Sequence, residues 1–137
     1  MVPSTQVEAN KANIRRYVDE ALNRGILDVI DETRGELAEH AKKKVRAWRT
    51  AFPDFHIAIE DLIAEGDDVV ARWTFTGTND GPFGDIPATG KPVNAPNGMG
   101  IFRLTDGKVT AAQLTWNKYL ILQQIGVLPL SASDAAV

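Results

Sequence analysis

Polar side chains recur at every second position near the end of the chain, at Gln113, Thr115 and Asn117. In a β-strand this spacing places all three on one face, together with Val109 and Ala111. That face is either exposed to solvent, as one face of many sheets is, or part of a pocket in which amides hold oxygen atoms of a ligand. A carboxamide does not exchange a proton near neutral pH, so Asn117 could hold a carbonyl or enolate oxygen but could not be a general base.

A second predicted strand, residues 93–104, carries a similar mixture of side chains. Asn97 shares one face with Met99 and Ile101. A few polar groups among apolar ones are typical of a ligand cavity, in which they orient an apolar guest. The alternative is an accidental pattern.

Metal, nucleophile and phosphate chemistry find little support in the sequence. His40 and His56 are the only histidines, and there is no cysteine. Neither histidine has further ligands at the spacing of a zinc or iron site. The serines lie near the termini, where neither histidine is placed to activate them, and no glycine-rich segment has the strand–turn–helix context of a phosphate loop. We therefore expect a site without metal or cofactor.

The elements that must position these residues begin with helices. Apolar residues at spacings of three and four form one stripe over residues 5–24, and the pattern recurs over 34–52 after a short helix at 26–32. Pro53 ends the last of these helices. Tyr17 belongs to the first stripe and could supply a phenol to an inner cavity, although a core tyrosine with its hydroxyl at the edge is the alternative.

Beyond these helices the hydrophobic period changes to that of strands. We expect strands over 55–62, 69–76, 93–104 and 108–117, and a final short helix over 118–126. The segment 77–92 is rich in Gly and Pro and predicts a long ordered loop. Helices followed by consecutive antiparallel strands indicate an α+β domain, in which a strongly bent sheet and the helices leave a cavity between the two layers.

Large apolar side chains are the candidates for the lining of this cavity. They are Trp73, Phe75, Met99, Phe102 and Trp116. Alternation along a strand permits only some of them to point inward, and Trp116 should point opposite to Asn117.

Length and charge narrow the class of protein. The chain has 137 residues and a net charge of −3. We expect residues 1–137 to form one domain, with a loose tail from about 130. The charge gives no field that would attract nucleic acid or an anionic membrane surface. No apolar run approaches the ~20 residues of a membrane span and no signal core is present, so we expect no membrane contact and a cytoplasmic location.

Five segments resemble the SnoaL-like polyketide cyclases. They are FPDFH at 52–56, AEGDDVVARWTFTGT at 64–78, GDIPATGK at 84–91, FRLTDGKV at 102–109 and QQIGVLP at 123–129. The resemblance extends over most of the chain. It implies the NTF2-like fold, an α+β cone in which a bent sheet and helices enclose a deep apolar pocket, and it implies a homodimer. The fold hosts several reactions and does not by itself identify one.

The resemblance also implies where the reaction takes place. Cyclases of the family use an aspartate at the end of the last strand as the acid/base of an intramolecular aldol closure, and Asn117 is at the matching position. A family histidine is matched by Asn79, and an aromatic residue four positions before the acid is matched by Gln113. The usual mechanism would then be broken or rerouted, with Asp80 as the proton carrier or with a substrate that enolises with little help.

Together these observations predict a tailoring enzyme that binds a hydrophobic polycyclic polyketide-type substrate and catalyses ring closure or isomerisation without a cofactor. The predicted catalytic residues are Asn117, Asp80 and Tyr17. The predicted substrate-binding residues are Asn79, Asn97, Gln113, Trp73, Phe75, Met99 and Phe102. Two alternatives stay open, namely hydroxylation of such a ring system and a pocket protein that binds without catalysis. An epoxide hydrolase is disfavoured, because Arg72 and Arg103 lack a convincing pair of pocket carboxylates.

Overall fold

The computed structural model describes residues 2–128, and the tail predicted from about residue 130 lies outside them. Helices come first in the chain. They are α1 (Val2–Arg16), the π-helix η1 (Tyr17–Leu22), α2 (Asp28–Arg34), the 3₁₀ turn η2 (Gly35–Leu37) and α3 (Ala38–Ala51). Strands and one short helix follow. They are β1 (His56–Glu65), β2 (Asp68–Thr78), β3 (Pro92–Thr105), β4 (Lys108–Thr115) and α4 (Lys118–Gln124).

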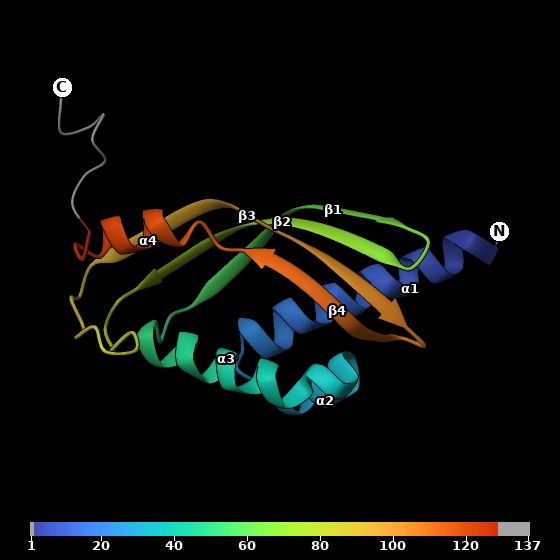
Figure 1. Cartoon of the computed structure of the whole chain (residues 1–137), viewed down its shortest axis with the longest axis horizontal. Helices are drawn as coiled ribbons and strands as arrows, with labels where there is room; N and C mark the ends of the chain where they lie inside the picture. The colour runs from blue at the N-terminus through green and yellow to red at the C-terminus, as the bar shows by residue number, and fades with distance from the viewer. Residues whose placement is uncertain (1, 129–137) are drawn as a thin grey trace, which may run out of the picture.

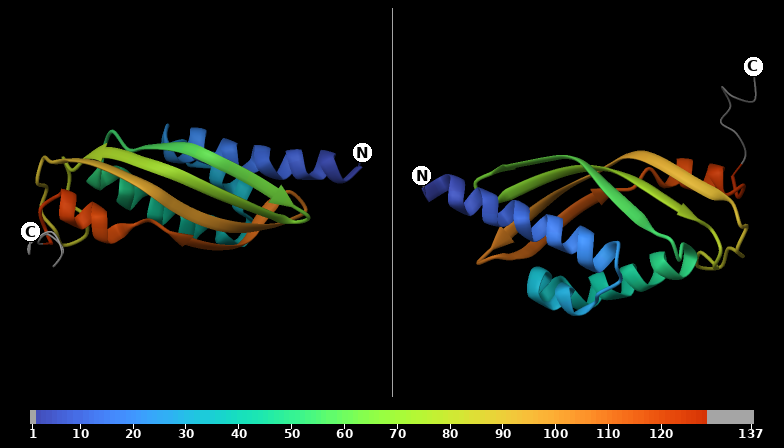
Figure 2. Two further views of the ribbon diagram at one scale, coloured as in Figure 1. Left: turned by 90° about the horizontal axis from the view of Figure 1, so that it is seen from above. Right: turned by 180° about the vertical axis from the view of Figure 1, so that it is seen from behind.

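The strands form one antiparallel sheet in the order β1-β2-β3-β4. Figure 1 and Figure 2 show that the sheet is curved and that α1, α2 and α3 cover one of its faces, while α4 lies beyond the end of β4. We call the covered face the inner face. Its side chains alternate with exposed ones along β2 and β3 and form most of the core with the helices. The predicted α+β architecture is confirmed.

The helix predicted over residues 5–24 is an α-helix up to Arg16 and a π-helix from Tyr17 to Leu22. In η1 the backbone bonds span five residues, as when the Asn23 amide donates to the Val18 carbonyl at 2.9 Å. The Asn23 side chain then exchanges two hydrogen bonds with the backbone of Ile57 in β1, at 3.0 and 2.7 Å. Arg49 of α3 donates to the carbonyls of Leu22 and Asn23. These hydrogen bonds connect η1 with α3 and β1. Turns of π-helix are frequently found at functional sites.

A bulge in β4 reverses part of the predicted face assignment. The pairing of β3 with β4 skips Thr110, which is an extra residue. Before the bulge, Val109 is fully buried. Beyond it, Gln113 lies opposite the exposed Ile101 on the outer face, and Leu114 takes the inner face. The prediction that Val109 and Gln113 share a face is wrong, because one extra residue exchanges the two faces of a strand.

Two glycines of β3 allow large side chains to occupy the inner face. A Cβ atom at Gly98 would overlap the indole of Trp73, and a Cβ atom at Gly100 would overlap the side chain of Leu114. The absence of a side chain at Gly98 therefore fixes where the Trp73 ring lies, because the ring packs directly on the β3 backbone.

Gly98→Ala is expected to lower the free energy of unfolding by about 2 kcal/mol, since the added methyl group overpacks a dense interior. Urea unfolding followed by tryptophan fluorescence measures the change. Gly84→Ala is the control, because nothing lies within 4 Å of its added Cβ and only its positive φ of 59° opposes the substitution. Equal stability of Gly98→Ala and the unaltered protein would contradict the packing argument.

Candidate functional site

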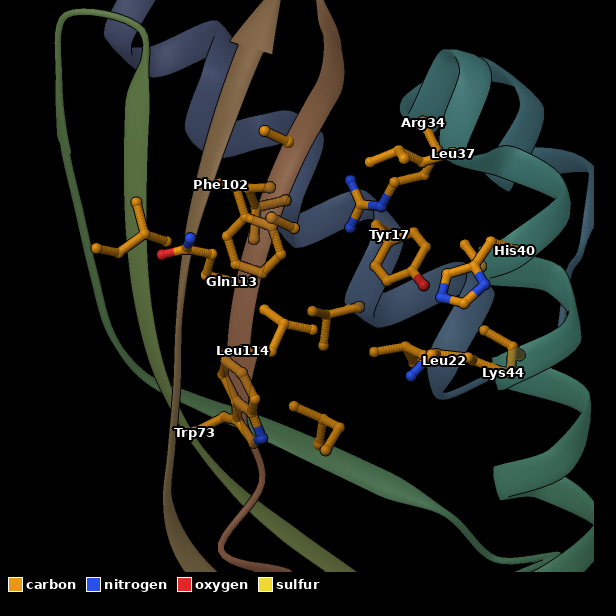
Figure 3. A pocket seen from close by; sticks show the side chains of 18 of the residues that line it. Tyr17, Leu22, Arg34, Leu37, His40, Lys44, Trp73, Phe102, Gln113 and Leu114 are labelled. Atoms are coloured by element: carbon orange, nitrogen blue, oxygen red, sulfur yellow. The ribbon is translucent and has the colours of Figure 1, made fainter.

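A cavity of about 830 Å³ lies between the helices and the inner face of the sheet. Its walls come from the helical segments α1, η1, α2, η2 and α3 and from strands β1, β2, β3 and β4. Figure 3 shows the cavity from close by. Most of the wall is aliphatic, with Ile14, Val18, Leu22, Leu37, Val45 and Ile57 among its residues. A volume and lining of this kind suit a small organic molecule.

Three tryptophans form an aromatic wall of the cavity, and Tyr17 and Phe102 are further aromatic residues of the lining. Trp48 of α3 stacks on Trp116 with ring centroids 4.9 Å apart and an interplanar angle of 25°. Trp73 of β2 meets Trp116 edge to face at 5.2 Å. Phe75 is fully buried and packs against Trp48 on the side away from the cavity. It was predicted to line the cavity, and it does not. Such a wall offers flat surfaces to a flat ring system.

Arg34 is the most buried charged residue of the lining. Only 4% of its surface is exposed. Its guanidinium carbon lies 3.5 Å from the centroid of the Tyr17 ring and 5.5 Å from that of Phe102, so cation–π contacts stabilise its position. Nη1 donates a hydrogen bond of 3.4 Å to Oδ1 of Asn13. Burial lowers the pKa of Arg34 to about 10, which leaves it charged at neutral pH.

Tyr17 and His40 are the lining residues best suited to acid–base chemistry. Burial raises the pKa of Tyr17, and the positive charge of Arg34 opposes the rise only in part. The phenol therefore keeps its proton at neutral pH and acts as a hydrogen-bond donor. Figure 3 shows its hydroxyl directed toward His40. His40 and Lys44 are exposed residues of α3 at the rim of the cavity, and an imidazole can take up a proton near neutral pH.

Asp68 and Arg103 also belong to the lining, but they neutralise each other. Nε and Nη2 of Arg103 donate to the two carboxylate oxygens of Asp68 at 3.0 and 3.2 Å, and these bonds lower the pKa of Asp68. Nε of Arg72 donates a single hydrogen bond of 2.7 Å to Oδ2 of Asp61. Within the described residues each of these arginines has one carboxylate partner, so the paired aspartates of an epoxide hydrolase are not formed around them.

The cavity brings together only some of the residues predicted from the sequence. Tyr17, Trp73 and Phe102 line it. Gln113 contributes to the lining, but Figure 3 shows its amide on the side of β4 opposite to Leu114. The other predicted residues lie outside the lining, namely Phe75, Asn79, Asp80, Met99, Asn97 and Asn117.

Asn97 and Met99 are exposed on the outer face of the sheet, so the face that they were predicted to share faces away from the cavity. Asn97 lies in a β-bulge with a φ of 64°, a conformation that asparagine adopts more readily than most residues. Its Oδ1 accepts a hydrogen bond of 3.3 Å from Arg72. Asp80 is exposed in the loop that follows β2.

Asn117 has a local structural explanation. It is the residue that precedes α4, and its left-handed conformation, with φ of 54° and ψ of 46°, turns the chain from β4 into that helix. Its Nδ2 donates a hydrogen bond of 3.4 Å to the carbonyl of Pro96. Asparagine tolerates this backbone conformation, so an amide at the end of β4 does not by itself indicate a ligand.

Asn79 is fully buried and uses its whole carboxamide within the protein. Nδ2 donates to the carbonyls of Ala51 and Gly81 at 3.2 and 2.8 Å. Oδ1 accepts from the amide and the hydroxyl of Thr89 at 3.0 and 2.9 Å. Asn79 thus fastens the loop after β2 to the end of α3, and its amide has no atom left for a substrate.

Sequence reasoning missed Arg34 and His40 as cavity residues. Both lie three positions from Leu37, a member of the apolar stripe of α3 and the turn before it. That spacing places them beside the stripe on the same side of the helical segment. This spacing could have indicated that both residues face the cavity. The lysines at 42–44 instead suggested that this side of the helix is exposed to solvent.

Two further properties concern residues 2–128. No three His, Cys, Asp or Glu side chains there gather in a way that could hold a metal ion. No helix in the same range is long and apolar enough to cross a membrane.

Comparison with known proteins identifies the class. The sequence model of the SnoaL-like polyketide cyclases matches residues 12–125, and the chain belongs to this family. No curated protein matches the chain.

Solved structures agree with this assignment. A proposed SnoaL-like polyketide cyclase from Jannaschia sp. CCS1 is 26% identical with a TM-score of 0.80, over 89% of this chain and 94% of that one. AclR from Streptomyces galilaeus, a proposed hydroxylase, is 26% identical with a TM-score of 0.81, over 95% and 88%. TsrD from Streptomyces laurentii is 26% identical with a TM-score of 0.78, over 88% and 97%. The predicted family and its NTF2-like fold are confirmed.

Proposed function

We propose that the protein is a tailoring enzyme that closes or isomerises a ring of a hydrophobic polycyclic polyketide-type substrate without a cofactor. The observation that carries this proposal is the combination of one large apolar cavity with Tyr17 and His40 in its lining. The tryptophan wall suits flat fused rings, and the membership of the family supports a polyketide as the guest.

The lining offers a route for the proton. In an aldol closure, a base removes a proton from a carbon between carbonyl groups, the resulting enolate carbon attacks a second carbonyl, and that carbonyl oxygen takes up a proton. His40 is the proposed base. Tyr17, which keeps its proton, is the proposed donor to the oxygen on which charge develops. The product has the same mass as the substrate.

This assignment replaces the earlier expectation for Asn117 and Asp80. Neither side chain lines the cavity, and Asn117 is already used by the turn into α4. The same applies to Asn79, whose amide is saturated. We therefore propose that the reaction is rerouted from the end of β4 to α3 and η1.

The test is incubation of the purified protein with an anthracycline-type polyketide methyl ester, followed by chromatography with mass detection. A new product of unchanged mass that requires the protein supports ring closure or isomerisation. A product heavier by one oxygen atom supports hydroxylation, the second candidate, which the likeness to AclR favours. Binding of the ester without a product would support a pocket protein without catalysis.

We further propose a homodimer through the outer face of the sheet. Val70, Met99 and Ile101 are 39%, 45% and 50% exposed there, and the pairing Val70 with Ile101 makes them neighbours. The Asp61–Arg72 ion pair borders this apolar strip without adding net charge. An apolar centre with a polar rim is typical of a subunit interface.

Val70→Glu is expected to convert the dimer into a monomer, because it places a charge in the centre of that apolar strip. Light scattering coupled to size-exclusion chromatography measures the mass. Ala12→Glu, a change at an exposed position of α1, is the control and should leave the mass unchanged. A monomeric unaltered protein would refute the interface.

A further inference from the structure

The positive charge of Arg34 has no counter-ion among residues 2–128, which the structure describes. No carboxylate of the described residues lies within 4.0 Å of its guanidinium nitrogens, although seven such ion pairs occur elsewhere among them. Nη2 is buried and has no hydrogen-bond partner at all. Charged groups are rarely buried in this way without a partner, because desolvation is costly.

The groups around the cavity add no compensating negative charge. On α3, His40 and Lys44 face it, and neither is an anion at neutral pH. On the sheet, Asp68 is held by two hydrogen bonds from Arg103. From η1 the facing group is Tyr17, whose raised pKa keeps it neutral. The lining therefore carries a net positive charge at neutral pH while most of its surface is apolar.

Figure 3 shows the Arg34 guanidinium directed into the cavity beside Tyr17, on the side of α2 and α3. Its flat group lies between the rings of Tyr17 and Phe102, which restrict its orientation. A planar guanidinium whose Nη2 has no partner is suited to a charge-assisted hydrogen bond with an anionic oxygen group.

We propose that the substrate of this cavity carries an anionic oxygen group, either a carboxylate or an ionised phenol or enol, which binds to Nη2 of Arg34. The inference rests on the proposed role of the cavity as the substrate site. It adds that the fused rings lie against the tryptophan wall and that the acidic group supplies the counter-ion that the protein lacks. A fully esterified, neutral polyketide would leave the charge of Arg34 uncompensated.

Binding of matched anthraquinones tests the proposal. Quenching of the lining tryptophans reports binding of anthraquinone-2-carboxylate, its methyl ester and 2-hydroxyanthraquinone. The carboxylate is expected to bind about 10–100-fold more tightly than the ester, as a charge-assisted bond in a dry site implies. The hydroxyanthraquinone is measured below and above the pH at which its phenol ionises. Tighter binding above that pH identifies an ionised phenol as an accepted source of the anion, and equal binding restricts the group to a carboxylate.

Variants assign the preference to Arg34. In Arg34→Met the carboxylate is expected to bind no better than the ester, while the affinity for the ester stays within about twofold, since the ester does not use the charge. Arg34→Lys, which keeps the charge but not the planar pair of donors, should retain a smaller preference. Arg15→Met, on the exposed side of α1, is the matched control and should behave as the unaltered protein.

Equal affinity of the unaltered protein for the carboxylate and the ester would overturn the inference, as would an unchanged preference in folded Arg34→Met. The first comparison needs no variant, so it decides the question even if a substitution prevents folding. Failure of the proposed reaction is a separate result. Ring closure without a carboxylate preference refutes only the role of Arg34, and a preference without turnover refutes only the reaction.

Discussion

His40→Gln is expected to lower the rate of ring closure about 10²–10⁴-fold, the usual contribution of a positioned general base. Glutamine has nearly the size of histidine and can form hydrogen bonds, but it cannot take up a proton. Because His40 is an exposed residue at the cavity rim, its replacement should leave the thermal stability unchanged. The measurement is the turnover number under saturating substrate.

Tyr17→Phe is expected to reduce the rate of ring closure about 10²–10³-fold. This is the usual effect of removing one hydrogen-bond donor to a developing oxyanion. The chain supplies matched controls for both residues. His56 is exposed on β1, and Tyr119 is 53% exposed on α4. His56→Gln and Tyr119→Phe should therefore retain the full rate. If His40→Gln keeps the rate of the unaltered protein, the base is another group and the proposed mechanism fails, whatever the effect of Tyr17→Phe.

Asn79→Ala is expected to lower the free energy of unfolding by about 3 kcal/mol, because it removes the four hydrogen bonds of a fully buried carboxamide. The side chain is fully buried, so water cannot easily replace it. The loop from Asn79 to the start of β3 loses one of its two hydrogen bonds to the Ala51 carbonyl at the end of α3, and the bond from the Gly81 amide at 3.2 Å remains. Urea unfolding measures the stability, and limited proteolysis detects the released loop.

Asn94→Ala is the control for this prediction. The side chain of Asn94 is exposed, and its hydrogen bonds with Gln124 use backbone atoms that alanine retains. Its stability should remain close to that of the unaltered protein. If Asn79→Ala were equally stable but bound the ester probe poorly, the residue would be a ligand-binding residue, as the sequence first indicated.

Most of the fold could be predicted from the sequence. The change of hydrophobic period at Pro53 separates helices from strands, and the AspGly turn at 106–107 pairs β3 with β4, as observed. These signals are local, so they need no knowledge of the rest of the structure. The predicted faces of the strands were reliable only up to the bulges. Thr110 and the extra residues near Asn97 shift the register. The run Pro96-Asn97-Gly98 is a signal of the second bulge, whereas the residues around Thr110 give none.

Of the residues predicted for the site, Tyr17, Trp73 and Phe102 line the cavity, whereas the three predicted asparagines do not. We predicted ligand-binding amides at Asn79, Asn97 and Asn117 because the sequence shows the functional group of a residue but not its backbone conformation. Two of them have positive φ, and the third is saturated by the loop that it holds. Asparagine is common in such positions for local reasons.

The sequence by itself determined the family, the order of helices and strands, and the aromatic residues from which a cavity wall could be built. Only the tertiary structure decided which polar groups face that cavity. Arg34 and His40 come from the helical layer and line the same cavity as Phe102 of β3, which is far away in the chain and lies 5.5 Å from the Arg34 guanidinium. The missing counter-ion of Arg34 is a property of all the elements packed around it, so no single segment of the sequence contains it.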